Sequence, residues 1–253
     1  MSPILALANQ KGGVGKTTTA INLGAAVAAL EQRVLLVDCD PQGNASRGLG
    51  IRIAGRPHLY HALTDQASVE SVVQSTGFPH FDIIPSDRDL VGAEVEFVGE
   101  SGWESRLKHL LAPLKERYAA ILLDCPPSLG HLTVLALTAS DGVLVPLQCE
   151  YFALEGISEL VSTIGRVQSN LNPELSIFGV VLTMYDDRTN LSRDVAEEAR
   201  RHFGSKVFSA VIPRNIRLAE APSHAMPILQ YDIKSRGAEA YLALGREFLE
   251  RLA

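Results

Sequence analysis

The stretch that decides the fold stands near the start of the sequence and reads Gln10-Lys11-Gly12-Gly13-Val14-Gly15-Lys16-Thr17-Thr18-Thr19. It follows an apolar run at 4–8 and precedes an alanine-rich run at 20–27, which is the order strand, glycine turn, helix. Glycines let successive backbone N–H groups turn toward a phosphate at a helix N-terminus, where Lys16 reaches the terminal phosphates and the Thr17 hydroxyl ligates Mg²⁺. The stretch is therefore predicted to be a phosphate-binding loop.

The loop departs from the usual pattern G-x-x-x-x-G-K-[ST] in two ways. Gln10 stands where the first glycine is expected, and an additional lysine, Lys11, follows it. A glycine-rich entry to a helix needs no lysine on both sides of the glycines, so a purely structural turn does not explain this stretch. We expect a phosphate loop of an unusual form, in which Lys11 has a role of its own.

Length and composition favour one folded unit of an intracellular kind. The chain has 253 residues, 46% of them hydrophobic, which suffices for one doubly wound α/β domain over 1–253. A charged loop occupies the place where a signal peptide needs an apolar core, and no run of about 18 apolar residues occurs. The sequence therefore predicts a cytoplasmic protein with no membrane segment.

The cysteine count argues against a protein held by disulfides, and the net charge argues against binding of nucleic acid by the overall charge of the molecule. The three cysteines, Cys39, Cys125 and Cys149, are odd in number and each ends an apolar run, so we expect small buried side chains and no disulfide framework. The formal net charge is −6 and the pI about 5.7. Binding to nucleic acid would therefore require a local basic patch.

Apolar runs alternate with helical patterns along the whole chain. Several of these runs are continuously apolar, as expected for parallel strands covered on both faces. We expect an α/β fold with a single doubly wound, mostly parallel sheet, helices on both faces and the ligand at the strand C-termini. The predicted strands are 4–8, 33–37, 81–85, 119–124, 142–147, 177–183 and 207–212, and the predicted helices about 17–31, 88–98, 102–117, 131–139, 153–170, 191–203 and 236–252; the stretch 45–80 gives little signal.

Carboxylates follow two of the predicted strands. Asp38 and Asp40 come after the second strand, and Asp124 comes after the fourth. In a parallel sheet these ends converge on the phosphate loop, so Asp124 is predicted to act on the Mg²⁺ shell. Asp40, one step beyond its strand end, is the better candidate for orienting the attacking water.

Taken together, these motifs resemble the deviant Walker A ATPases and, within them, the ParA/Soj partition proteins. The resemblance covers essentially the whole chain. It is carried by Lys11 to Thr18, Val37-Asp38-Cys39-Asp40-Pro41-Gln42-Gly43-Asn44, Leu123-Asp124-Cys125-Pro126-Pro127-Ser128, the block from Gln148 to Gly156, Thr183-Met184-Tyr185-Asp186, Arg188-Thr189-Asn190-Leu191 and the block from Val211 to Ser223.

The resemblance implies a weak, Mg²⁺-dependent ATPase that forms a face-to-face homodimer with ATP. Lys11 would reach the partner's phosphates, and a side chain at Gly12 would obstruct the dimer by its volume. Lys11, Lys16 and Asp40 would be catalytic, while Thr17 would hold Mg²⁺ and Asp38 and Asp124 would support it, in their case through water. The absence of Asn-Lys-x-Asp at the strand end after 183 favours ATP over GTP. The implied ATP contacts are Lys11, Gly12, Gly13, Val14, Gly15, Lys16, Thr17, Thr18, Met184, Pro213 and Asn215.

The same resemblance implies non-specific binding of double-stranded DNA in the ATP state, and release after hydrolysis stimulated by a ParB-type centromere-binding partner. Arg188 and Arg217 match the DNA-contacting positions, with Arg193, Arg214 and Lys234 as neighbours. Phosphate contacts are weak singly and add over a surface, so a dimer that doubles the patch would place DNA binding under ATP control. The expected role is chromosome or plasmid segregation at the nucleoid.

Three alternatives share the same nucleotide site. A MinD-type membrane-cycling ATPase would need a basic amphipathic end, whereas 238–253 has balanced charges and is expected to dock on the core through positions 241, 244, 248 and 252. A redox protein like the nitrogenase iron protein would need two cysteines per subunit, and 41–124 has none. A nucleotide-gated positioning ATPase without DNA binding stays open.

Overall fold

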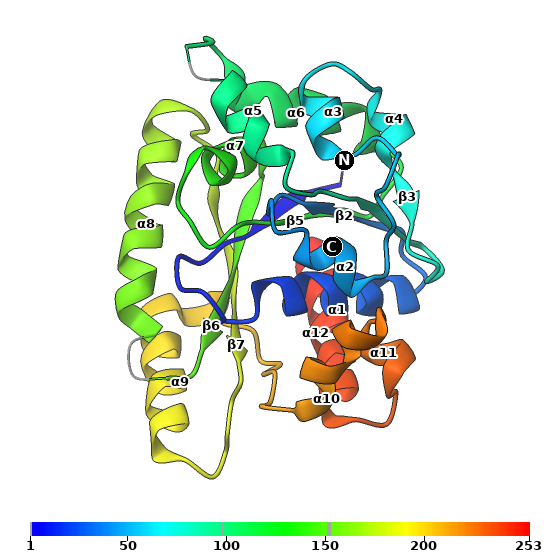
Figure 1. Ribbon diagram of the computed structural model, residues 1–253. Coiled ribbons are helices and arrows are strands. Elements are labelled where there is room, and N and C mark those ends of the chain that lie inside the picture. The colour runs from blue at the N-terminus through cyan, green and yellow to red at the C-terminus, as the bar shows by residue number, and fades with distance from the viewer. Residues whose placement is uncertain (1, 98, 151–152) are drawn as a thin grey trace.

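A seven-stranded sheet forms the centre of the computed structural model, which describes residues 2–97, 99–150 and 153–253 (Figure 1). The strand order is β3-β4-β2-β5-β1-β6-β7. Every neighbouring pair is parallel except β3 with β4. The strands are β1 (Ile4–Leu7), β2 (Val34–Asp38), β3 (Gln74–Ser75), β4 (Phe81–Ile84), β5 (Ala120–Asp124), β6 (Gly142–Gln148) and β7 (Ser176–Thr183).

Strand register brings the carboxyl ends of three strands to one edge. β1 lies between β5 and β6, and Leu7 pairs with Asp124. On the other side of β5, Asp38 also pairs with Asp124. Because all three strands are parallel and in step, the loops that follow Leu7, Asp38 and Asp124 emerge side by side, as expected for a ligand site in a doubly wound sheet.

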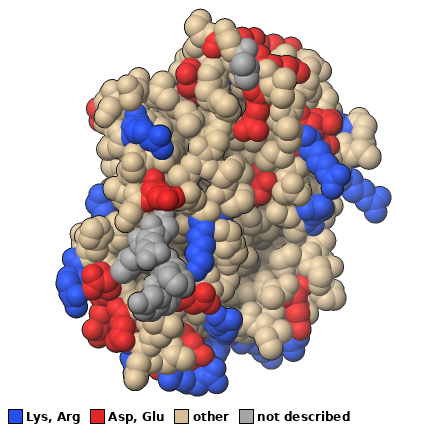
Figure 2. All heavy atoms as spheres, turned by 60° about the vertical axis from the view of Figure 1, so that its left-hand side comes forward, with Lys and Arg blue, Asp and Glu red and all other residues tan. Residues whose placement is uncertain are grey.

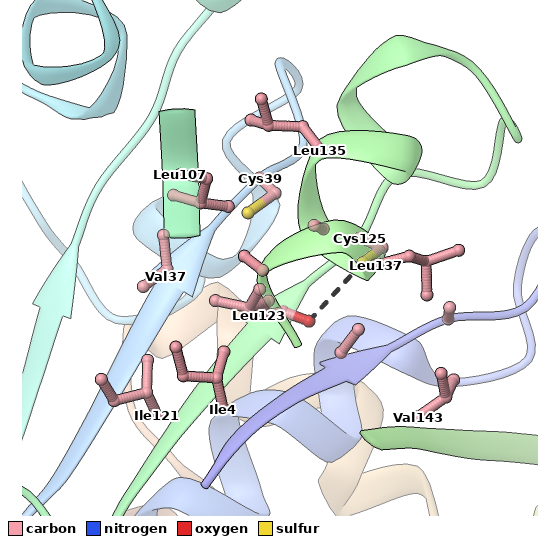
Figure 3. Close-up of a cluster of buried hydrophobic side chains, with 14 of the residues drawn as sticks. Ile4, Val37, Cys39, Leu107, Ile121, Leu123, Cys125, Leu135, Leu137 and Val143 are labelled. Carbon is pink, nitrogen blue, oxygen red and sulfur yellow. Dashed lines mark hydrogen bonds between the residues drawn. The ribbon is translucent and has the colours of Figure 1, made fainter. Parts of the chain in front are cut away.

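The side chains of the sheet alternate between two hydrophobic clusters. Ile4 and Ala6 of β1 belong to one cluster, whereas Leu5 and Leu7 belong to the other. Strands buried on both faces need apolar residues at every position, which explains their continuous apolar runs. Cys39 and Cys125 are buried in the first cluster beyond the ends of β2 and β5 (Figure 3), so they are the small buried residues that the sequence predicts.

Helices cover both faces, which confirms the predicted doubly wound architecture. The face of Leu5 and Leu7 packs on α1 (Lys16–Ala29), α2 (Asn44–Gly48), α10 (Ile216–Glu220), α11 (Ile228–Tyr231) and α12 (Arg236–Leu252). The face of Ile4 and Ala6 packs on α3 (Leu59–Leu63), α4 (Val69–Val72), α5 (Leu90–Glu96), α6 (Arg106–Leu111), α7 (His131–Ala139), α8 (Ala153–Asn170) and α9 (Asn190–Phe203).

The strand predicted at 207–212 is wrong, and one carboxylate explains the difference. This segment runs beside β7, where Phe208 N donates to Val180 O at 2.9 Å. The next two N–H groups, those of Ser209 and Ala210, instead donate to the Glu247 carboxylate of α12, at 2.9 and 3.0 Å. Backbone N–H groups that donate to a side chain cannot also form the hydrogen bonds of a strand ladder. In the described residues, only isolated bridges to this segment therefore remain.

Other departures concern short elements. The stretch 45–80, which gave little signal, contains α2, α3, α4 and the edge strand β3. The helix predicted at 102–117 is divided into η1 (Trp103–Ser105), α6 and η2 (Ala112–Leu114), with Pro113 inside the last turn. Two further turns are η3 (Gly204–Lys206) and η4 (Ala221–His224).

The last helix docks on the core as predicted. α12 lies against α1 (Figure 1), and its Tyr241, Leu244 and Phe248 are buried. The Tyr241 hydroxyl lies 3.2 Å from the Thr19 hydroxyl of α1. Among the residues that the structure describes, no helix has both the length and the apolar character that spanning a bilayer requires.

Candidate functional site: a nucleotide loop and its surroundings

The loop between β1 and α1 has the backbone of a phosphate cradle. Gly13 and Gly15 have φ of +75° and +90°, in the left-handed region that side chains disfavour. The Lys16 ammonium lies across the loop and donates to the carbonyl oxygens of Asn9, at 2.9 Å, and Lys11, at 3.2 Å. Burial lowers the pKa of Lys16, while the charge of Asp124 opposes this shift. The predicted loop residues therefore come together as one cradle.

Two polar residues that the sequence analysis did not identify hold the loop in place. Asn9 donates from Nδ2 to Pro146 O at 2.8 Å and accepts the Lys11 N–H at 3.0 Å. The Thr183 hydroxyl donates to Val14 O at 2.8 Å. Both are buried side chains at strand ends. A polar residue at the carboxyl end of a buried strand, next to a glycine loop, is the signal by which such anchors can be recognised.

Two cavities adjoin the loop. One, of about 300 Å³, is lined by loop residues together with Asp40, Asn44, Pro127 and Met184. The other, of about 390 Å³, lies beyond Gly15 and is mainly apolar, with Met184, Pro213, Asn215, Leu218 and Tyr241 in its wall. Gly15, Thr18 and Met184 line both cavities. A cavity at the glycines that Lys16, Thr17 and Asp40 line, and a mainly apolar one beside it, match the two ends of a nucleotide.

Met184 has an unusual backbone at this junction. Its φ is +52°, which a residue with a side chain rarely adopts. The next residue, Tyr185, donates its N–H to Ile212 O at 3.0 Å. Strained backbone of this kind gathers at functional sites, and Met184 stands where the two cavities meet.

Asp38 is buried and fully engaged by its neighbours. Its Oδ2 accepts the Ser46 N–H at 2.9 Å and the Ser46 hydroxyl at 2.7 Å, and its Oδ1 accepts the Asp40 N–H at 3.2 Å. Burial raises the pKa of Asp38 to about 6, although these hydrogen bonds act in the opposite direction. Asp38 thus fixes the turn that carries Asp40. Its place in a metal shell stays a prediction.

Asp124 is buried, with the Thr17 hydroxyl near its carboxylate. Neither carboxylate oxygen has a hydrogen bond from the described residues. Burial, and then the charge of Asp38, raise the pKa of Asp124 well above its ordinary value, while the Thr17 hydroxyl and the Lys16 ammonium lower it. Buried carboxylates are normally paired or bound to a metal. A carboxylate and a hydroxyl beside a phosphate cradle are the hard oxygen donors that Mg²⁺ takes together with phosphates.

Asp40 lies at the wall of the phosphate-sized cavity. Its Oδ1 accepts the Gln42 N–H at 2.9 Å, and its carbonyl oxygen accepts the Ser86 hydroxyl at 2.7 Å. The Ser86 N–H in turn donates to the Ser46 hydroxyl at 3.1 Å. Residues 38, 40, 46 and 86 thus form one buried polar network that holds the backbone of Asp40, while the Gln42 N–H holds its carboxylate.

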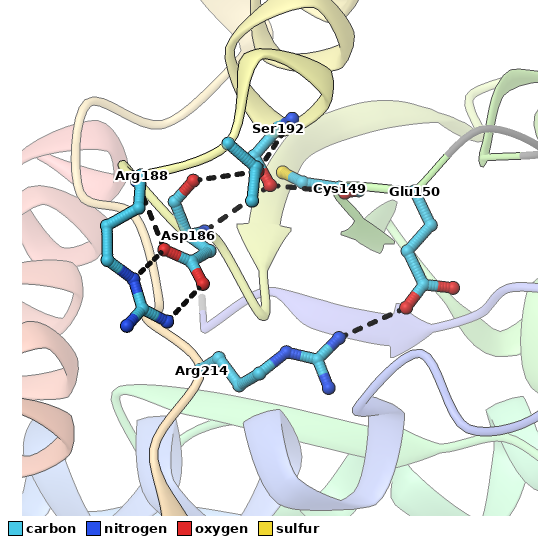
Figure 4. A network of polar contacts seen from close by, with 7 residues as sticks. Cys149, Glu150, Asp186, Arg188, Ser192 and Arg214 are labelled. Carbon is cyan, nitrogen blue, oxygen red and sulfur yellow. Dashed lines mark hydrogen bonds and ion pairs between the residues drawn. The ribbon is translucent and has the colours of Figure 1, made fainter.

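Lys11 lies on the outer side of the loop. Its ammonium is 3.8 Å from Glu150 Oε2, and Arg214 also contacts Glu150, at 3.1 Å (Figure 4). Next to Lys11, Gly12 is exposed, and a Cβ there would meet no atom within 4 Å. No residue that the structure describes therefore requires glycine at position 12. Tyr151 and Phe152 of the quoted 148–156 block lie outside the described residues.

The predicted DNA-binding cations differ in their surroundings. Arg188 and Arg214 line a cavity of about 780 Å³ that also includes Arg236, a residue the sequence analysis missed. Arg217 is next to Ile216 of that cavity's lining, and it contacts Glu220 at 2.8 Å and Asp232 at 3.5 Å. Lys234 follows Asp232 on an exposed turn, and Arg193 lies on α9 beside Asn190.

Most of these cations already have an acidic partner. Arg188 makes two hydrogen bonds with the Asp186 carboxylate, at 2.8 and 2.7 Å (Figure 4). Figure 2 shows basic and acidic side chains interspersed at the lower end of the molecule. Exposed ion pairs contribute little net free energy, so an incoming phosphate can replace them at small cost.

Sheet, loop and buried carboxylates define the chain as a P-loop nucleotide-binding protein with a deviant Walker A loop. The profile of a family described as "AAA domain" matches residues 2–177. The chain is 55% identical over 251 residues to the chromosome partitioning protein ParA of Caulobacter vibrioides, covering 98% of this chain and 94% of that protein. It is 54% identical over 248 residues to the sporulation initiation inhibitor protein Soj of Bacillus subtilis, covering 98% of each.

Similarity to solved structures agrees with these matches. The cobyrinic acid a,c-diamide synthase of Mycobacterium smegmatis, solved with bound ADP and magnesium, superposes with a TM-score of 0.86 at 37% identity over 99% of this chain and 95% of that one. The chain belongs to the ParA/Soj family of chromosome-partitioning ATPases.

Proposed function

We propose that residues 1–253 form a single Mg²⁺-dependent ATPase domain, which dimerises with ATP, binds DNA without sequence preference in that state and segregates a chromosome or plasmid with a ParB-type partner. The observation that carries the proposal is the buried carboxylate of Asp124, which lies beside Thr17 and the glycine loop and accepts no hydrogen bond of normal length from the described residues. A bound Mg²⁺ would neutralise this charge and polarise the phosphates.

The cavity beyond Gly15 supports ATP as the nucleotide. It is mainly apolar, as a stacked base requires, and Met184, Pro213 and Asn215 line it. Asn215 caps α10 by accepting the Arg217 N–H at 2.8 Å, which leaves its amide N–H groups as donors. These three residues would contact adenine.

Hydrolysis would depend on residues that position charge and water. Lys16 would leave the loop carbonyls and contact the terminal phosphates, and Thr17 and Asp124 would hold Mg²⁺, with Asp38 supporting the shell through water. Asp40, fixed by the 38–46–86 network, would orient the attacking water. Such catalysis consists mainly of positioning and charge stabilisation.

The nucleotide site is tested with Lys16→Ala. Among the described lysines, Lys16 is the one whose ammonium lies across the loop. The variant should therefore lose ATP binding in a fluorescent-nucleotide titration while keeping its circular dichroism spectrum. Retained ATP affinity would contradict the phosphate-loop assignment.

Dimerisation would place Lys11 on the partner's phosphates. Lys11 already lies on the exposed side of the loop, next to a glycine whose Cβ position is open. Glu150 would have to release Lys11 for this step, and the pair is half-exposed and 3.8 Å apart, so the release is cheap.

DNA binding would come from Arg188 and Arg217, with Arg193, Arg214 and Lys234 adding to the surface. A dimer presents each cation twice, and affinity for phosphates rises steeply with the number of contacts. This gating by ATP would keep the protein on the nucleoid until hydrolysis releases it.

The DNA assignment is tested with Arg217→Ala in a filter-binding assay with ATP. The variant should bind every duplex sequence more weakly and keep ATP affinity, because a phosphate contact carries no sequence information. Lys108→Ala, which removes an exposed cation on α6, is the matched control and should bind normally. Normal DNA binding by Arg217→Ala would remove Arg217 from the surface.

A nucleotide-gated positioning ATPase that binds no DNA is the second candidate. The observation in its favour is that Arg188, Arg214 and Arg217 are each paired with a carboxylate. ATP hydrolysis without duplex binding in any nucleotide state would favour this candidate. The docking of α12 on the core argues against a MinD-like membrane form.

A further inference from the structure

Acidic charge is concentrated in one part of the chain that the nucleotide site does not use. Residues 87–104 contain six acidic side chains and one basic one, Arg88, a net charge of −5 within a chain of net charge −6. These residues include α5, at the top of the molecule in Figure 1, and Figure 2 shows acidic side chains gathered at this end. The rest of the chain is therefore almost neutral.

An apolar face lies within this acidic region. Val91 and Val95, one helical turn apart on α5, are 48% and 70% exposed. Leu90 and Ala93 of the same helix are buried, so α5 is already packed on the core through its other face. We call Asp89, Val91, Glu94, Val95 and Glu96 the α5 patch.

The acidic groups of the α5 patch lack cationic partners among the described residues. Glu96 accepts a hydrogen bond from the Tyr60 hydroxyl at 2.7 Å, and Glu94 accepts the Leu132 N–H at 3.4 Å. Asp89 lies 3.7 Å from His58 Nε2, and burial lowers the pKa of His58, so this ring is neutral at pH 7. The negative charge of the patch is therefore uncompensated, in contrast to the paired arginines of the DNA surface.

We propose that the α5 patch is the docking surface for a basic, amphipathic segment of the ParB-type partner, with apolar side chains on Val91 and Val95 and Lys or Arg side chains on the surrounding carboxylates. Charge complementarity selects this occupant, because exposed acids around an apolar centre attract a cation-bearing apolar segment. The same charge repels DNA, so partner and DNA would occupy different surfaces. The inference rests on the proposed function.

The patch is connected to Asp40 by a short path. Ser86, one residue before the acidic segment, donates its hydroxyl to Asp40 O and its N–H to Ser46. Gly43, in the turn after Asp40, approaches so closely that a Cβ there would lie 2.7 Å from Ser86 O. A shift of 87–96 on docking would therefore move the residue proposed to orient the attacking water, which gives partner binding a route to stimulate hydrolysis.

The test uses the full chain with Val95→Lys and the cognate ParB-type protein. Position 95 is mostly exposed and lysine is a good helix former, so the variant should fold. It should keep its basal ATPase and its ATP-dependent DNA binding, while the partner concentration for half-maximal stimulation rises by about tenfold or more. Val161→Lys, at a 40% exposed valine on α8, is the matched control and should respond like the wild type.

Stimulation of Val95→Lys at wild-type partner concentrations would overturn the assignment of the α5 patch. A photo-crosslinking amino acid at position 95 should also capture the partner, and capture at 161 but not at 95 would overturn it as well. A wild-type protein that binds no DNA and gains no turnover from the partner would instead refute the proposed function.

Discussion

Gly12→Val separates the folding of this chain from its dimerisation. A Cβ at position 12 would meet no atom of residues 2–97, 99–150 and 153–253 within 4 Å, and φ of Gly12 lies outside the left-handed region. Valine should therefore change the free energy of unfolding by no more than about 0.5 kcal/mol, as surface substitutions do. In the proposed dimer the same position faces the partner, where three added carbon atoms would prevent closure.

Gly13→Val is the matched comparison. A Cβ at position 13 also meets nothing within 4 Å, but φ is +75°. A side chain in that region costs roughly 1–2 kcal/mol, which corresponds to a fall in Tm of about 2–8 °C for a chain of this size. The two neighbouring substitutions should thus differ in stability although both positions are open.

The assay is analytical ultracentrifugation with ATP and Mg²⁺, with both substitutions made in an Asp40→Ala background so that ATP persists. The parent should sediment as a dimer, and Gly12→Val should sediment as a monomer that still binds ATP and melts at the parent's temperature. A Gly12→Val protein that dimerises like its parent would refute the placement of this loop in the interface. A lower free energy of unfolding in Gly12→Val would contradict the conclusion that a side chain at position 12 meets no other described residue of its own chain.

Two further predictions concern the carboxylates. Asp40→Ala should bind ATP and dimerise but hydrolyse poorly in a phosphate-release assay, because the network that fixes Asp40 would no longer orient the water; full turnover would remove Asp40 from this role. In nucleotide-free protein with a chelator, the raised pKa of Asp38, about 6 against 3.8, means that the folded state binds its proton more tightly. The free energy of unfolding should therefore fall by roughly 3 kcal/mol as pH rises from about 4 to about 6. Urea titrations at several pH values in this range should show that the free energy of unfolding depends less steeply on pH for Asp38→Asn than for the wild type. An identical pH dependence in the two proteins would contradict the assignment of this proton to Asp38.

The elements that surround the loop could be predicted because local pattern and burial agree there. β1, the glycine loop and α1 follow from two apolar runs and the glycines between them, and α12 follows from apolar residues at helical spacing. The carboxyl ends of β2 and β5 had to converge once the sheet was parallel. The register between β2 and β5 therefore places Asp38 beside Asp124, although the two residues are far apart in the sequence.

Elements set by distant contacts could not be predicted. The segment 207–212 has the composition of a strand, and only the folded position of Glu247 removes its donors from the ladder. Asn9 lies outside the quoted motifs, and Thr183 was quoted without a role; their hydrogen bonds to Pro146 and Val14 become apparent only in the folded chain. The pairing of Arg188, Arg214 and Arg217 with carboxylates likewise depends on side-chain proximity rather than on sequence pattern.

The measurement that tests the central claim most directly is binding of the wild-type protein to a random-sequence duplex with ATP, with ADP and without nucleotide, at two salt concentrations. The account predicts binding with ATP alone, and weaker binding at the higher salt concentration because phosphate contacts release counterions. Equal binding in all three nucleotide states, or none in any while ATP is still hydrolysed, would contradict a nucleotide-gated DNA-binding ATPase.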